Sequence, residues 1–153
     1  MSVAPFLSTR WRRSAPVWVA FGLLPVLFAV GCAGGQSGSA AGASVIGVTE
    51  RDFAISAPKY LAAGDVVLRV QNRGPDGHEL IVVRLDRGSL PMRSDGMTVS
   101  EEAVERREVG VLEPGASGAL RDLRLSLAPG RYELFCNMSG HYLSGMHTLL
   151  VVK

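Results

Sequence analysis

The sequence predicts an all-β domain of the Greek-key sandwich or small-barrel type, with one short helix in a long connection. From residue 45 onward, apolar residues recur at every second position, and Gly, Pro, Asn and Asp separate the alternating runs. About seven such runs fall within roughly a hundred residues, which is the strand density of a β-sandwich or small barrel. No internal repeat of solenoid length accompanies them.

The predicted strands are short and have one buried face. The clearest cover residues 66–70, where Val66, Leu68 and Val70 share a face, and residues 123–127, where three leucines do. The remaining candidates are residues 45–48, 78–85, 109–112, 131–136 and 147–152. Turn-forming residues separate them at 63–65, 72–77 and 128–130.

One segment breaks the two-residue period. Residues 98–101 (Thr-Val-Ser-Glu) have the form of a capping box and open the short helical run EEAVERR, residues 101–107. This run ends a long connection that begins at Asp86. We expect it to cover one side of the sandwich, the alternative being a segment that binds a partner.

The N-terminus, residues 1–31, has the pattern of a lipoprotein-type signal peptide. Three arginines within residues 10–13 precede an apolar stretch, residues 17–30, which is short for a bilayer span and contains Pro25. The end of this stretch and Cys32 resemble the lipobox of bacterial lipoproteins, although Ala29 replaces the usual leucine. The resemblance implies lipid attachment at Cys32 and an exported protein anchored at the outer face of the cytoplasmic membrane. The alternatives are an uncleaved anchor and cleavage without a lipid.

The composition of residues 32–44 predicts a flexible tether, which would precede a folded domain at residues 45–153. After Cys32 the tether contains small and polar residues (AGGQSGSAAGAS), which cannot bury enough apolar surface to fold.

The formal net charge of the chain is +2, from 16 basic and 14 acidic residues. The signal region holds three arginines and no acid, so 13 basic and 14 acidic residues remain, a net charge of −1. We therefore expect no nucleic-acid partner. We also expect the protein to be a monomer.

The chemistry of the chain is concentrated near its C-terminus. Cys136, His141 and Met146 follow the spacing Cys-x4-His-x4-Met, and His78 opens an earlier predicted strand. One thiolate, two imidazoles and a thioether form the ligand set of a mononuclear type 1 copper site. The soft sulfur ligands stabilise Cu(I), while imidazole also suits Cu(II).

Strand alternation places two of these side chains on the core side. Cys136 has the parity of Tyr132 and Leu134, and His78 has the parity of Leu80 and Val82. Neighbouring strands would then supply one ligand each, and glycines between Cys136 and Met146 let the chain turn back. By the same parity, His147 should point to the opposite side. Met138 is too close to Cys136 in sequence to converge on the same metal ion.

The residues from 45 to 153 resemble the cupredoxins, the family of small blue copper proteins, and in particular exported bacterial cupredoxin-like lipoproteins. The resemblance rests on the region of His78 and on the segment from Cys136 to Met146, and it implies that His78, Cys136, His141 and Met146 bind one copper ion. Family members commonly have asparagine after the first histidine, where this chain has Glu79. That difference concerns the hydrogen bonds around the site and hence the reduction potential.

The resemblance implies a one-electron carrier that cycles between Cu(II) and Cu(I), with His141 on the solvent side of the site. The partner would be an unidentified redox protein. An alternative with the same ligands is a module that buffers copper or delivers it to an exported copper protein. Tyr142 and Leu143 would either form a docking surface or pack in the loop. An enzyme is not expected, because three histidines are too few for an additional copper centre. The remaining alternative is that the domain binds no metal and serves as an adhesion or interaction module.

Overall fold

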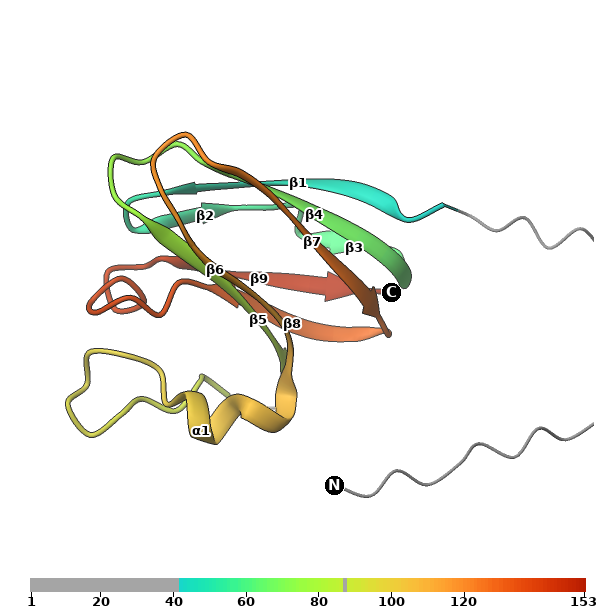
Figure 1. The fold of residues 1–153 in the computed structure, drawn as a ribbon. Coiled ribbons are helices and arrows are strands. Elements are labelled where there is room, and N and C mark those ends of the chain that lie inside the picture. Colours follow the sequence, from blue (N-terminus) through green and yellow to red (C-terminus); the bar gives the residue numbers. More distant parts are fainter. Residues whose placement is uncertain (1–41, 87) are drawn as a thin grey trace, which may run out of the picture. The chain divides into compact units, whose positions relative to one another are not determined.

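The computed structural model describes residues 42–86 and 88–153, which form a two-layered β-sandwich (Figure 1). The predicted signal peptide, Cys32 and most of the predicted tether lie outside the described residues. Among the helices of the described part, none has the length and apolar character needed to cross a membrane. An all-β sandwich with one short helix is the fold class that the sequence predicts, and the structure confirms it.

Nine strands of the described region form two sheets. The first sheet has the order β2-β1-β4-β7, with bounds β1 Ser44–Arg51, β2 Ala54–Ser56, β4 Gly64–Asn72 and β7 Leu120–Leu127. The second has the order β3-β9-β8-β5-β6, with bounds β3 Tyr60–Leu61, β5 His78–Leu85, β6 Glu108–Gly115, β8 Gly130–Phe135 and β9 His147–Val152. Most neighbours are antiparallel, but β1 runs parallel to β4, and β3 to β9.

The core lies between the two sheets and follows the predicted alternation. Val66, Leu68 and Val70 of β4 are buried in one cluster with Leu80 of β5 and Leu134 of β8. The sequence pattern missed β2 and β3, because strands of two or three residues are too short to show a period. It also included Cys136 in a strand, whereas β8 ends at Phe135 and Cys136 follows it directly.

The connection between β5 and β6 covers the outer face of the second sheet, as predicted. It ends in helix α1, Glu101–Val104, and a 3₁₀ turn, Glu105–Arg107. Val104 and Val99 pack there against Ile81 of β5 and Phe135 of β8, and Figure 1 shows α1 on the side of β5 and β8 that faces away from the first sheet.

The predicted capping box is wrong. The helix begins one residue after Ser100, which is the N-cap and makes no capping hydrogen bond through its side chain. The Glu101 carboxylate, expected to close the box, instead accepts a hydrogen bond from Asn137 Nδ2 at 2.9 Å. The Glu101 side chain is therefore used for a tertiary contact with the chain just beyond Cys136, and no pattern in the sequence indicates that contact.

Candidate metal centre

Three of the four predicted site residues meet at one end of the sandwich. The potential ligand atoms of His78, Cys136 and His141 all lie within 4.8 Å of one another. His78 is the first residue of β5 and Cys136 follows β8, and these two strands are hydrogen-bonded neighbours. Figure 1 shows the β1–β2 turn, the turn after β4 and the loop after β8 at this same end, opposite the start of β1.

His78 is fully buried and oriented by Asp52. Its Nε2 lies 3.0 Å from Asp52 Oδ1, so Nε2–H donates to the carboxylate and the lone pair falls on Nδ1. Nδ1 is buried and has no hydrogen-bond partner. Buried polar atoms are rarely left unpaired, so a bound metal ion is the natural partner for this nitrogen.

The turn before His78 is built to admit this pair of side chains. Asn72 holds the turn, because its Nδ2 donates to the carbonyls of Asp76 and Gly115 and its Oδ1 accepts from the N–H of Gly74. A Cβ at Gly74 would clash with Asp52 Oδ1 and lie 2.9 Å from His78 Nε2. Glycine is therefore required here by the close approach of side chains.

Cys136 and His141 face each other across the site. Cys136 is fully buried, and its Sγ lies 3.6 Å from His141 Nδ1. Burial raises the pKa of the Cys136 thiol, while backbone hydrogen bonds from Met138 and Glu79 favour the thiolate and offset part of that effect. A cation bound to the sulfur would stabilise the thiolate further.

Met146 is fully buried and belongs to the same core cluster as Cys136. We call residues 137–146 the ligand loop. Its ends are tied together, because the N–H of Cys136 donates to the Met146 carbonyl at 3.1 Å and the N–H of Met146 donates to the His141 carbonyl at 3.0 Å. The thioether is thus held in the core near the site, and its ligation of copper stays a prediction.

Glu79 links β5, which begins with His78, to the chain that follows β8 at Cys136. Its Oε1 accepts a hydrogen bond at 3.0 Å from the backbone N–H of Asn137, the residue after Cys136. Burial raises the pKa of Glu79, the hydrogen bond from Asn137 lowers it, and the nearby acids Glu101 and Glu113 raise it further. Glu79 therefore places a partly buried carboxyl group beside the site.

The sequence did not single out Asp52 and Phe53, which also contact the site. Phe53 has a left-handed backbone with φ of 62°, and its half-exposed ring meets the His141 ring edge-on at 5.5 Å. Both residues lie in the turn after β1, where no spacing or motif distinguishes them. Such contacts depend on tertiary structure, which brings the turn to the site from far away in sequence.

The other residues considered in the sequence lie outside the group. His147 is partly exposed and its Nδ1 lies 3.1 Å from Glu133 Oε1, so its predicted orientation away from the site is confirmed. Met138 and Leu143 are exposed, at 37% and 59%. Tyr142 packs in the loop, because it stacks against His147 and its hydroxyl donates to Glu133.

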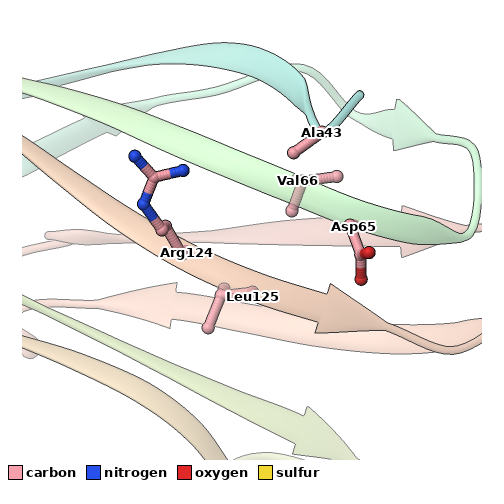
Figure 2. Close-up of a pocket in the computed structure, with 5 residues that line it drawn as sticks. All are labelled: Ala43, Asp65, Val66, Arg124 and Leu125. Carbon is pink, nitrogen blue, oxygen red and sulfur yellow. The ribbon is translucent and has the colours of Figure 1, made fainter. Parts of the chain in front are cut away.

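A pocket in the described region lies at the end of the sandwich opposite the candidate centre. Figure 2 shows its lining residues, which come from the residue just before β1 and from β4 and β7. They are Ala43, Asp65, Val66, Arg124 and Leu125. None of them offers a soft ligand, whereas the ligand atoms of His78, Cys136 and His141 converge at the other end.

No protein-family model matches the sequence, and no curated protein sequence matches it either. Solved structures do match. The chain superposes on auracyanin A, a blue copper protein of Chloroflexus aurantiacus, with a TM-score of 0.55 and 20% identity, covering 73% of this chain and all of that one. The chain has the cupredoxin fold. Auracyanin from Roseiflexus castenholzii matches with a TM-score of 0.54 and 16% identity, covering 73% of this chain and 99% of that one. Rusticyanin from Thiobacillus ferrooxidans matches with a TM-score of 0.53 and 14% identity, covering 72% of this chain and 78% of that one.

The donor set within this cupredoxin fold fits a copper ion. The buried thiol of Cys136, the unpartnered Nδ1 of His78 and the imidazole of His141 converge, with the thioether of Met146 buried in the same cluster. Two imidazoles with soft sulfur donors suit copper in both of its common oxidation states.

Proposed function

We propose that this protein is a one-electron carrier with a single type 1 copper ion bound by His78, Cys136, His141 and Met146. The observation that carries the proposal is the convergence of a buried thiol and two imidazoles, one of which has a buried nitrogen without a partner. Copper bound there supplies the Cu(I)/Cu(II) couple. The fold shared with auracyanin and rusticyanin supports the same function.

The chain's own residues hold the site in a fixed geometry and exclude water. Asp52 orients His78, Glu79 joins the two strands, and the core encloses Cys136 and Met146. Little rearrangement between oxidation states is what fast electron exchange requires, and hydrogen bonds around the ligands tune the potential. His141 is only half-buried, so it provides the route from the site to a redox partner.

We further propose that the carrier is exported and anchored through a lipid on Cys32, with residues 32–44 as its tether. The sequence pattern of the first 32 residues supports this placement. The proposed function is that of a carrier rather than a multicopper enzyme, because His147, the third histidine, faces Glu133 and leaves no imidazole for a second copper centre.

Redox cycling of the copper-loaded protein tests the proposed function against copper delivery. We expect the copper-loaded protein to have an intense visible band that arises from charge transfer between the Cys136 thiolate and Cu(II). A one-electron reductant should bleach this band and an oxidant should restore it fully. Copper should be retained through several such cycles in the presence of a competing Cu(I) chelator. Loss of copper to the chelator on each reduction, at a rate faster than electron exchange with a small redox protein, would contradict the carrier and favour the delivery module.

A further inference from the structure

Glu133 is a nearly buried carboxylate on the side of β8 that faces away from the sandwich core. It is 7% exposed, and its neighbours there include Phe135 and Leu149 of the second apolar cluster. Its Oε1 accepts a hydrogen bond from the Tyr142 hydroxyl at 3.0 Å and lies 3.1 Å from His147 Nδ1. Burying a carboxylate is costly unless it is paired, so these two contacts are what the position requires.

The partners of Glu133 form one aromatic cluster. The rings of Tyr142 and His147 stack, with centroids 4.7 Å apart and an interplanar angle of 26°. The Tyr142 ring also meets Phe135 edge-on at 5.6 Å. We call Glu133, Phe135, Tyr142 and His147 the backing cluster.

Each aromatic member of the backing cluster is covalently next to a proposed copper ligand. Phe135 precedes Cys136, Tyr142 follows His141, and His147 follows Met146. Adjacent residues in extended chain point to opposite sides, so at the strand ends Cys136 and Met146 face the core while Phe135 and His147 lie behind the sheet. Tyr142 lies in the turn after His141 and reaches the same side through its contacts with Phe135, His147 and Glu133. Fixing the neighbours therefore fixes the backbone from which the ligands project.

We propose that Glu133 is a positioning residue of the metal centre, which sets the backbone at His141 and Met146 by holding Tyr142 and His147. The inference rests on the proposed copper site and names a residue that does not touch it. Within the ligand loop the hydrogen bonds of the backbone are mostly local, as in His141 N–H to the Met138 carbonyl. Glu133 adds a connection from the loop to a central strand of the second sheet.

Amide hydrogen exchange in the copper-free protein tests the positioning role. The reporters are the amides of His141 and Met146, which donate within the loop. We expect Glu133→Leu, which removes both contacts, to speed their exchange by about tenfold. Glu133→Gln keeps an acceptor for the Tyr142 hydroxyl and should exchange as the wild type does. Tyr142→Phe, which loses a single hydrogen bond and keeps its ring, should fall between them.

Tyr132→Phe is the matched control. Tyr132 lies on the same strand, and its hydroxyl donates to the Ala128 carbonyl at 2.8 Å, at the other end of β8. The control loses one hydrogen bond of the same kind and should leave the loop amides unchanged. Unchanged exchange in both Glu133→Leu and Tyr142→Phe would overturn the proposal, and so would an equal increase in Tyr132→Phe. If Glu133→Leu does not fold, comparing the exchange rates of the loop amides in Tyr142→Phe and Tyr132→Phe still tests the proposal.

The copper-loaded protein gives a second, separate readout. With Cu(II) bound, we expect Glu133→Leu to change the copper hyperfine splitting in the electron spin resonance spectrum and Glu133→Gln to restore the wild-type value. An unchanged spectrum in Glu133→Leu would overturn the positioning role at the metal. If the wild type itself takes up no Cu(II), the proposed copper function fails, while the exchange data on copper-free protein still test whether Glu133 holds the loop.

Discussion

At the scale of single residues, the two imidazoles of the candidate centre are held in different ways. His78 is fully buried, and Asp52 fixes its ring through Nε2. His141 is held through packing, by the edge of Phe53 on one side and the His78 ring, 5.2 Å away between centroids, on the other. The buried histidine is therefore oriented by a hydrogen bond, and the half-buried one depends on the loop that carries it.

Replacing Met146 tests the fourth ligand. We expect Met146→Leu to retain copper but to shift the reduction potential, because a weak axial thioether tunes the potential of such sites more than it contributes to affinity. A spectroelectrochemical titration measures the shift. Met138→Leu is the control, because Met138 is exposed and lies in the same loop. Equal potentials in Met146→Leu and the wild type would show that Met146 is not the axial ligand.

Glu50 is a second buried acid near the site, and it makes the stability of the domain depend on pH. It is fully buried on β1, and Arg121 of β7 donates to its Oε2 at 2.6 Å. Burial raises the pKa of Glu50 from 4.5 to about 7, although Arg121 acts in the opposite direction. The folded state thus holds this proton more tightly than the unfolded state, so the resulting stability is complete below about pH 4.5 and is lost as the pH rises through 7.

Glu50→Gln should remove this pH dependence. We expect the wild type to lose on the order of 3 kcal/mol of unfolding free energy from this group between pH 4.5 and pH 8. The glutamine variant should lose correspondingly less, since its side chain stays neutral and still accepts from Arg121. Urea unfolding of copper-free protein across this range measures the difference, with the exposed Glu108→Gln as control. Parallel pH profiles for wild type and Glu50→Gln would refute the assignment.

At the scale of elements, the turn between β4 and β5 positions His78 and leaves no room for a side chain at Gly74. Gly74→Ala should displace Asp52 or His78 and destabilise the domain by about 1–3 kcal/mol, the usual effect of overpacking. Thermal unfolding measures the loss, and the copper spectrum should change with it. Gly47→Ala on β1 has open space around the new methyl group and is the control. A wild-type melting temperature and spectrum in Gly74→Ala would contradict the close approach.

The elements also show how far the sequence predicts the structure. Alternation identified the long strands and placed Cys136 and His78 on the core side, because the period of two survives wherever one face is buried. The Cys-x4-His-x4-Met spacing identified a loop whose ends the structure ties together. Contacts between segments that are distant in the chain produce no periodicity or spacing in the sequence, so they could not be predicted from it. Asp52, Phe53 and Glu133 reach their partners only through the fold, and Glu101 bonds to Asn137 instead of capping its helix.

At the scale of the whole molecule, the fold separates two ends with different chemistry. The candidate centre lies where the β1–β2 turn, the turn before β5 and the ligand loop gather, and β1 starts at the other end (Figure 1). The start of the domain, before β1, thus lies at the end away from the half-buried His141.

The visible and electron spin resonance spectra of the copper-loaded protein test the central claim most directly. We expect one Cu(II) ion per chain, an intense thiolate-to-copper visible band and the small hyperfine splitting of a type 1 site. Cys136→Ser should abolish the band, because the band requires the thiolate. A colourless Cu(II) complex with the wide splitting of an ordinary tetragonal site, or a band that persists in Cys136→Ser, would contradict the account.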